Sequence, residues 1–561
     1  MISAFTLSGC IVFPWNSSSI SGTNSSTKNT SPNSSGSDLS SLEPHFDDEE
    51  EDEEDIVNPI QKTKFDYDYK DYSKHCFLDN DYTPSVGNPK LLVIPVWFTD
   101  SEACITENHK EDVREDIETA YFGTREETGW HSVKTYYSKM SQGRCSLDGV
   151  VTDWYEIGEA MDAYGNNTEK TTSLVNTAAD WYFSQAGSLP RSYFDSDSDG
   201  YLDGVMLIYA APDQISAYND WDDENDGREN FWAYTSWTME EADQDTPTAN
   251  AFFWASFDFM YDWGSANART GLYFYGGGNP PVGGHVDAHT FIHEMGHMFG
   301  LPDYYDYSGQ YSPAGGFSMQ DHNVGGHDPY SALALGWSDP YVPEDSCTLT
   351  IRPFQGKGRD LVLLQPNGFN VDNSPFDEYV LLELYTPTGL NQLDSETQYT
   401  TYSGSNQAPQ GPMEIGIRVW HVDARLVKIK TRGTSYFTPD TSHPKKVPDE
   451  DNLYFMMTNS YDHPLKDMSG RLSVCGAGYY NYNILQLIRN DRSTTYHCDR
   501  ELEGNDLFGN NSQFTCSQYS SQFVNGRKLN SGDTLGWTVN VSITTGERAK
   551  DARATLTLTR D

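Results

Sequence analysis

The chain has 561 residues and a formal charge of −46, because it contains 83 acidic and only 37 basic side chains. A chain of this length is expected to fold into two or three domains around a sizeable core. Such an acidic surface repels phosphates, so nucleic acid is excluded as an expected partner, whereas divalent cations, an extracellular setting or a salty environment suit it.

The first 60 residues show no pattern of a folded domain. Residues 11–43 are rich in Ser, Asn, Thr and Gly, and an acidic run, Asp47–Asp55, follows them. These segments hold too few apolar side chains to offset the entropy lost on ordering. We therefore expect a disordered stalk over residues 1–60. No stretch of the chain is apolar enough to span a membrane as a helix.

The segment Leu7-Ser8-Gly9-Cys10 resembles the lipobox of bacterial lipoproteins, in which the cysteine is lipidated and becomes the first residue. A serine-rich stalk is typical after such a cysteine. The apolar stretch Met1–Leu7 is short for a signal peptide and contains no basic residue. Two interpretations stay open. Either the true start lies upstream and Cys10 anchors the protein at the cell surface, or the resemblance is accidental.

The chain contains eight cysteines. If Cys10 is lipidated, an odd number remains, and these cannot all pair with one another. Cys498 and Cys516 flank a polar loop and could form a disulfide. The full connectivity does not follow from sequence.

Strands and helices alternate through residues 61–345. Continuous apolar runs predict buried strands, helical spacing of apolar residues predicts helices, and one segment alternates as a half-buried strand does. In chain order we expect a strand over 91–98, a helix over 130–141, a strand over 145–155, a helix over 171–186 and a strand over 204–210. This mixture predicts an α+β or α/β catalytic domain over residues 61–345.

An acidic loop precedes the last of these strands. Aspartates at its first, third and fifth positions, followed by Gly200, form the pattern of an oxygen-rich calcium loop. The ligands that this spacing predicts are Asp195, Asp197, Asp199, the backbone carbonyl of Tyr201, and Asp203. Met206 stands where an EF-hand has its last glutamate, so we expect a structural calcium site and no full EF-hand. The alternative is an acidic turn without an ion.

A metal-binding motif lies between residues 293 and 303, and reads His-Glu-x-x-His-x-x-Gly-x-x-Asp. Two histidines four residues apart on a helix, His293 and His297, place both imidazoles on one face, where they can bind one zinc ion. Glu294 can serve as the base for a zinc-bound water. Gly300 ends the helix and lets Asp303 return to the same ion as a third ligand.

The surroundings of this motif favour the metal site over two merely polar histidines. Apolar residues at helical spacing give the helix a buried side, Asp287 is a plausible N-cap, and Pro302 follows the glycine that ends it. The third ligand has rivals. Asp303 is preferred because a short turn delivers it, but other acceptable side chains are Asp306, His322, His327 and, in a different zincin architecture, Glu378 or Glu383.

A methionine follows the motif at a suitable distance. Met319 comes after the paired glycines Gly315 and Gly316, which supply turn chemistry. In metzincins a methionine in a tight turn underlies the metal site. We therefore expect Met319 to form a Met-turn, although a methionine in such a loop is otherwise most often a core residue.

From residue 346 the pattern changes to short strand-like runs separated by turn residues. These runs cover 347–353, 359–365, 379–385, 415–422, 453–458, 484–489, 537–544 and 554–559. Such spacing is typical of β-sandwiches. We expect a β-rich, sandwich-like C-terminal region over residues 346–561.

Several separated segments together resemble the immune inhibitor A family of secreted bacterial metallopeptidases. The zinc motif His293–Asp303 continues into Tyr304-Tyr305-Asp306, and Gly316–Met319 is similar to the methionine turn of that family. Further similar segments are Tyr136–Gly143, Asp195–Gly204, Asp328–Ser331, Leu335–Trp337, Glu383 and Gly416–Asp423. The resemblance covers about residues 88–490.

The resemblance implies a zincin-like, metzincin-like catalytic domain with endopeptidase activity on extracellular proteins and peptides. It implies zinc on His293, His297 and Asp303, with Glu294 as the base. Two other functions stay open. One is a surface adhesin or glycan-binding protein on an inactive peptidase fold, against which the intact Glu294 counts. The other is an amidase or deacetylase that uses the same metal chemistry.

Overall fold

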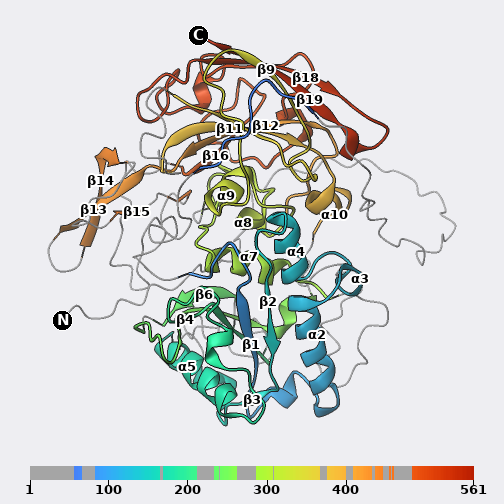
Figure 1. Ribbon diagram of the computed structural model, residues 1–561, viewed down its shortest axis with the longest axis vertical. Helices are drawn as coiled ribbons and strands as arrows, with labels where there is room; N and C mark the ends of the chain where they lie inside the picture. The colour runs from blue at the N-terminus through green and yellow to red at the C-terminus, as the bar shows by residue number, and fades with distance from the viewer. Residues whose placement is uncertain are drawn as a thin grey trace, which may run out of the picture.

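The computed structural model describes residues 56–65, 82–164, 168–211, 231, 233–238, 240–261, 286–306, 309–366, 376–399, 408–432, 436–445, 454–455, 458–459 and 483–561. Cys10 and nearly all of the expected stalk lie outside these residues. Figure 1 shows a mixed α/β part, β-rich sheets at the opposite end, and helices α7 (His289–Met298), α8 (Met319–His322) and α9 (Pro329–Ala334) between them.

The N-terminal part is built on one sheet in the order β2-β1-β5-β8-β6. Its strands are β1 (Lys90–Trp97), β2 (Asp148–Val151), β5 (Gly204–Tyr209), β6 (Tyr234–Trp237) and β8 (Ala251–Ser256), and the short β3 (Tyr155–Glu156) also pairs with β1. All pairings are parallel except that of β6, which runs antiparallel at the edge. The expected strands at 91–98 and 204–210 are confirmed, and their continuous apolar character reflects burial on both faces.

Helices pack on this sheet from several directions. Helix α5 (Thr168–Ser184) contacts β1 and β5, while α2 (Lys110–Phe122) contacts β2 and α4 (Val133–Met140). A capping box of Ser132 and Thr135 starts α4, and α3 (Arg125–Thr128) precedes it. Helix α7 lies against β6, β8 and α4. The expected helices at 130–141 and 171–186 are therefore both present.

The C-terminal region is β-rich, as expected. One sheet has the order β10-β11-β12-β16 and a second has the order β17-β18-β19-β9. Their strands are β9 (Cys347–Ile351), β10 (Leu361–Leu364), β11 (Glu378–Tyr385), β12 (Gly416–Asp423), β16 (Leu485–Ile488), β17 (Gln513–Phe514), β18 (Trp537–Thr544) and β19 (Arg553–Arg560). A third sheet consists of β13 (Leu426–Arg432), β14 (Tyr436–Lys445) and β15 (Tyr454–Phe455), and β4 (Tyr201–Leu202) pairs with β7 (Thr248–Ala249).

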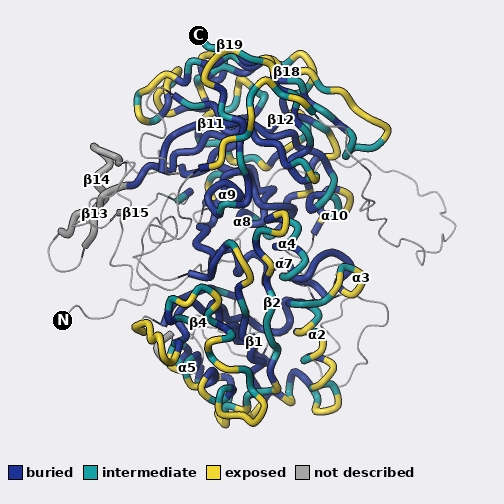
Figure 2. The backbone as a smooth tube through the Cα atoms, in the orientation of Figure 1, coloured by how far each residue is buried: buried dark blue, intermediate teal, exposed yellow. Residues whose placement is uncertain are grey.

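The sheet β10-β11-β12-β16, here called the middle sheet, is buried on both faces. Every residue of β11 and β12 is buried. Leu381 and Trp420 belong to the core that also contains α7, whereas Val380 and Leu382 belong to a second core with β18 and β19. Figure 2 shows the buried backbone running from one part into the other. The segments 61–345 and 346–561 therefore share a hydrophobic core.

The segment at residues 56–65 lies on the C-terminal region. The side chain of Asn58 forms two hydrogen bonds with the backbone of Thr350, and Lys62 Nζ lies 2.9 Å from Asp360 Oδ1. Lys62 also forms a β-bridge with Tyr341. This segment therefore covers the outer edge of β9 before the chain enters the N-terminal sheet.

Cysteine pairing and membrane spans were both considered from the sequence. Cys498 and Cys516 are not joined by a disulfide, and the thiols of Cys104, Cys145 and Cys347 are free as well. The possible Cys498–Cys516 bridge is therefore wrong. The fold buries Cys516 in the second core, with β18 and β19, while the carbonyl of Cys498 accepts the N–H of Ser312. Within the described part of the chain, no helix is both long and apolar enough to cross a bilayer.

Candidate metal centre

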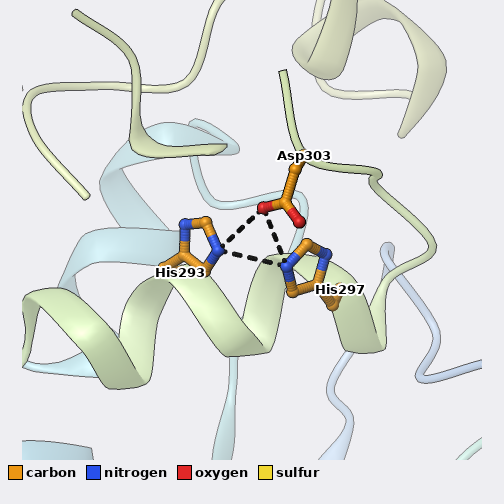
Figure 3. A group of neighbouring side chains, drawn as sticks. All are labelled: His293, His297 and Asp303. Carbon is orange, nitrogen blue, oxygen red and sulfur yellow. Dashed lines mark hydrogen bonds and ion pairs between the residues drawn. The ribbon is translucent and has the colours of Figure 1, made fainter. Parts of the chain in front are cut away.

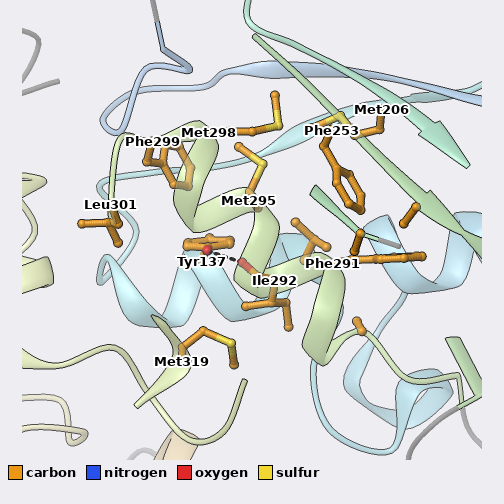
Figure 4. Close-up of a cluster of buried hydrophobic side chains, with 14 of the residues drawn as sticks. Tyr137, Met206, Phe253, Phe291, Ile292, Met295, Met298, Phe299, Leu301 and Met319 are labelled. Carbon is orange, nitrogen blue, oxygen red and sulfur yellow. Dashed lines mark hydrogen bonds between the residues drawn. The ribbon is translucent and has the colours of Figure 1, made fainter. Parts of the chain in front are cut away.

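Helix α7 carries the metal motif and is buried along its whole length. Its apolar side chains, among them Phe291, Ile292 and Met295, pack against α4 and the N-terminal sheet (Figure 4). The hydroxyl of Tyr137 donates a hydrogen bond to the carbonyl of Ile292 at 2.6 Å, inside the helix. The helix is therefore fixed by its surroundings in both position and rotation.

The N-terminus of α7 differs from the expectation. The N-cap residue is Ala288, one position after Asp287, which was expected to be the cap. The carboxylate of Asp287 still accepts the backbone N–H of His289 at 3.1 Å, and it also contacts the imidazole of the same residue. The cap prediction was wrong by one residue because the backbone of Ala288, and not of Asp287, makes the turn into the helix.

The C-terminus of α7 forms a Schellman motif. The N–H of Gly300 donates to the carbonyl of His297 at 2.9 Å, and the N–H of Leu301 donates to the carbonyl of Gly296 at 3.1 Å. Gly300 has a φ of +97°, which a residue with a Cβ rarely adopts. This reversal brings Asp303 back over the helix, as the spacing predicted.

Three side chains converge above the helix (Figure 3). The Nε2 atoms of His293 and His297 lie 3.1 Å apart. Asp303 Oδ1 lies 3.1 Å from the first and 3.3 Å from the second. All three residues are at most 4% exposed. Of the described residues, these three form one of two clusters that could hold a metal ion.

The second nitrogen of each imidazole shows which atoms face the cluster. His293 Nδ1 lies 2.8 Å from the carbonyl of Met319, and His297 Nδ1 lies 2.7 Å from the carbonyl of Leu301. Since a carbonyl only accepts, both Nδ1 atoms carry a proton, and the two Nε2 atoms face each other and Asp303. As zinc ligands the two imidazoles would be neutral, with their Nε2 lone pairs directed at the ion.

The donor set and its spacing fit zinc. Ligand atoms of a tetrahedral zinc site, about 2.0–2.1 Å from the ion, are separated from one another by about 3.3 Å. The three distances in this cluster are 3.1, 3.1 and 3.3 Å. Two imidazoles and one carboxylate also leave a fourth position for water or substrate, as in catalytic zinc sites.

The electrostatics of the cluster separate its two carboxylates. Burial would raise the pKa of Asp303, but the charges and hydrogen bonds of His297 and His293 outweigh burial and hold that pKa well below its usual range. Burial raises the pKa of Glu294, and the neighbouring charge of Asp303 adds to the rise, although the histidines oppose it. Asp303 is thus suited to bind a cation and Glu294 to exchange a proton.

Glu294 is held by a residue that the sequence did not single out. The hydroxyl of Thr235, on the edge strand β6, lies 3.0 Å from Glu294 Oε2 and 3.0 Å from the backbone carbonyl of Glu294. Both side chains are buried. A lone threonine in a short strand gives no signal in the sequence, because its partner lies on a helix far along the chain.

The rival ligands lie elsewhere. Asp306 accepts the N–H of Gln310, and His327 contacts the hydroxyl of Tyr137 at 3.2 Å. His322 Nδ1 pairs with Asp321 at 2.6 Å. In the middle sheet Glu378 contacts His421 at 2.7 Å, and Glu383 contacts Arg418 at 2.6 Å. None of these side chains joins the cluster of His293, His297 and Asp303 among the described residues.

Met319 and its neighbour Gln320 contact the two histidines of the cluster. Met319 is fully buried and supplies the carbonyl that holds His293. Gln320 packs so closely on α7 that a Cβ on Gly296 would lie 2.1 Å from its Oε1 atom. Gly296 therefore leaves room for the amide of Gln320 beside the helix.

The acidic loop before β5 forms the second cluster. One carboxylate oxygen from each of Asp195, Asp197 and Asp199 lies within 4.8 Å of the others. Asp203 is turned away, because its carboxylate accepts the backbone N–H of Lys90 at 2.6 Å and the N–H of Ser196 at 3.1 Å. Burial raises the pKa of Asp203 to about 7.

Tyr201, whose backbone carbonyl is the predicted ligand, forms two other hydrogen bonds beside the loop. Its N–H donates to Asp199 Oδ1 at 3.0 Å, and its hydroxyl reaches the carbonyl of Glu240. The structure thus gathers the carboxylates of Asp195, Asp197 and Asp199, whereas the carboxylate of Asp203 bonds to the backbone of Lys90 and Ser196. Calcium binding by this loop stays a prediction.

A family model described as the immune inhibitor A peptidase M6 catalytic domain matches residues 82–182. The matched segment contains β1, α2 and α4, which support the metal helix, and ends before the cluster itself. No curated relative matches the chain. The match supports the resemblance to the immune inhibitor A peptidases over residues 82–182, which include Tyr136–Gly143 of the segments that first suggested it.

Proposed function

We propose that this protein is a zinc-dependent endopeptidase that cleaves peptide bonds of proteins outside the cell. The convergence of His293 Nε2, His297 Nε2 and Asp303 Oδ1 beside the buried Glu294 carries this proposal. It is supported by the metallopeptidase family match over residues 82–182.

In this proposal His293, His297 and Asp303 hold the zinc ion, which when bound supplies Lewis acidity and a water of lowered pKa. Glu294 accepts a proton from the attacking water and returns it to the leaving amine nitrogen. Its raised pKa brings proton affinity closer to neutral pH. The hydroxyl of Thr235 donates a hydrogen bond to Oε2 of this carboxylate and so restrains its orientation.

We further propose that the domain is zincin-like and that Met319 forms its Met-turn. The support is the position of Met319, buried beneath the cluster with its carbonyl 2.8 Å from His293 Nδ1. That contact selects the tautomer in which Nε2 faces the ion. The role of Met319 therefore lies in its backbone as well as in its side chain.

Replacing Glu294 by alanine should abolish peptide cleavage while zinc stays bound. General acid–base catalysis contributes about 10²–10⁴-fold to rate, so kcat/KM on a peptide library should fall by at least that factor. Glu115→Ala, at an exposed position of α2, is the matched control and should cleave like the wild type. Zinc content measured on both proteins excludes loss of the metal. Wild-type turnover in Glu294→Ala would refute the role of the residue.

The contribution of the Thr235 hydroxyl can be tested separately from that of the side-chain volume. Thr235→Val keeps the volume but removes the hydrogen bond to Glu294, and should lower kcat by about 10-fold with little change in KM. Thr235→Ser keeps the hydroxyl and should restore most of kcat. Equal activity of the two variants, at equal zinc content, would show that the hydroxyl does not position Glu294.

The intact and buried Glu294 favours the peptidase over an inactive adhesin on the same fold. Cleavage of casein that stops when a zinc chelator is added separates the two functions. An amidase or deacetylase would instead act on small amides and leave casein intact.

We also propose a structural calcium ion at Asp195, Asp197 and Asp199. Three clustered carboxylates repel one another unless a cation neutralises them. EGTA, in the presence of added zinc, should therefore lower the thermal unfolding temperature, and calcium but not magnesium should restore it. An unfolding temperature that does not respond to EGTA would end the calcium proposal.

We propose that the protein acts at the cell surface, attached through lipidated Cys10. The support is the lipobox-like Leu7–Cys10 followed by the Ser/Asn-rich segment. Mass spectrometry of the protein from native membranes should find a diacylglyceryl group on Cys10. An unmodified Cys10 in protein released from the cell would contradict the anchor while leaving the peptidase proposal intact.

A further inference from the structure

The carboxylate of Asp394 is buried where the C-terminal region meets the metal helix. Asp394 lies on the short helix α10 (Gln392–Glu396), which follows β11 of the middle sheet, and it is fully buried. Its Oδ2 accepts the backbone N–H of Gly325 at 2.6 Å, and its Oδ1 lies 3.4 Å from His289 Nε2. A buried carboxylate without partners strongly destabilises a fold, so these contacts offset the cost of burying Asp394.

His289 is the first residue of α7, one helical turn before His293. Its imidazole is sandwiched between Trp130, with ring centroids 4.0 Å apart, and Tyr399 of the C-terminal region, at 4.3 Å. Its Nδ1 lies 2.6 Å from Asp287 Oδ1, and Asp287 also accepts the hydroxyl of Tyr399. The C-terminal region thus touches this imidazole on one face and at its outer nitrogen.

The charge of His289 strengthens these contacts. Burial disfavours the charged form, but Asp287 and Asp394 outweigh burial and raise the pKa of His289 to about 10. At neutral pH the residue is therefore a cation between two carboxylates and two aromatic rings, an arrangement in which each neighbour attracts it. The start of α7 is thereby fixed to α10.

A second route leads from the same C-terminal segment to a metal ligand. Asn391 Oδ1 accepts the N–H of Gly326 at 3.0 Å. The carbonyl of Gly326 accepts the N–H of Met319 at 3.4 Å, and the carbonyl of Met319 lies 2.8 Å from His293 Nδ1. Three successive hydrogen bonds therefore connect Asn391 to the imidazole of His293.

The turn between these elements is shaped to receive the C-terminal side chains. A Cβ on Gly325, whose φ is +64°, would lie 3.0 Å from Asn391 Oδ1. A Cβ on Gly326 would lie 2.1 Å from Nε2 of Gln355, another C-terminal residue. The backbone of this turn therefore lies in close contact with the side chains of Asn391 and Gln355, and the positive φ of Gly325 disfavours other residues there.

We propose that Asp394 and Asn391 are positioning residues of the metal centre, so that the β-rich C-terminal region is an integral part of that centre. Asp394 holds α7 through His289 and holds the turn at Gly325, while Asn391 holds the same turn and, through Met319, the orientation of His293. The inference rests on the proposed binding of zinc by the cluster. It gives the C-terminal region a role in the metal centre that is independent of any role in substrate binding.

The test replaces Asp394 by asparagine in the full chain. Asparagine keeps the shape and the acceptor for Gly325 but removes the charge that faces His289. The matched control is Glu396→Gln, the same change of charge at an exposed position of α10. Zinc affinity is measured by competition with a chromophoric chelator, the ligand field by the absorption spectrum of the cobalt-substituted protein, and folding by thermal unfolding.

Outer-shell partners of metal ligands typically contribute 10–100-fold to metal affinity or activity. Folded Asp394→Asn should therefore bind zinc about 10-fold more weakly and show an altered cobalt spectrum. Its kcat should fall by a larger factor than its KM changes. Glu396→Gln should match the wild type in all of these measurements. A folded Asp394→Asn with the wild-type zinc affinity and cobalt spectrum would overturn the proposal.

Should Asp394→Asn fail to fold, Asn391→Ala takes its place, because it removes the hydrogen bond to Gly326 and leaves the buried ion pair intact. Unchanged zinc affinity in that variant would equally overturn the proposal. Failure of the proposed function looks different. A wild-type protein that binds zinc but cleaves no peptide refutes the endopeptidase, while the comparison of zinc affinities still decides the role of Asp394.

Discussion

Two imidazole nitrogens and a carboxylate oxygen are held about as close together as atoms of one coordination shell. Contacts outside the cluster fix the position of these side chains. The carbonyls of Met319 and Leu301 hold the two histidines, and the reversal at Gly300 holds Asp303. Met319 is itself tied to the turn at Gly326, so the restraints extend into the C-terminal region. The geometry of the cluster is therefore a property of several distant segments.

The middle sheet is what makes this extension possible. Its strands are buried on both faces. One face packs against the core that contains α7, and the other packs against the sheet β17-β18-β19-β9. A sheet of this kind transmits position well, because neither face can move without disturbing close packing. Buried ion pairs such as Glu383 with Arg418, whose guanidinium also reaches the carbonyl of Phe317, connect the sheet to the loop that carries Met319.

Much of the site could be predicted from the sequence because its chemistry is local. The spacing of His293, His297, Gly300 and Asp303 lies within one helix and one turn, and the strands of both regions are marked by continuous or alternating apolar residues. The misplaced cap at Asp287 and the wrong cysteine pair depended on details of backbone and tertiary geometry. Thr235 and Asp394 could not be recognised, because the importance of a single polar side chain is set by a partner far along the chain.

The dependence of the metal centre on Asp394 has a consequence for the order of assembly. A chain is synthesised from its N-terminus, and its earlier domains generally fold first. Here α7, with both histidines, is synthesised well before α10, which carries Asp394. The middle sheet, whose apolar face packs against the core of α7, is also incomplete at that stage. The centre can reach its final geometry only late in synthesis. For the proposed endopeptidase, such a delay would keep the chain inactive until its synthesis is complete.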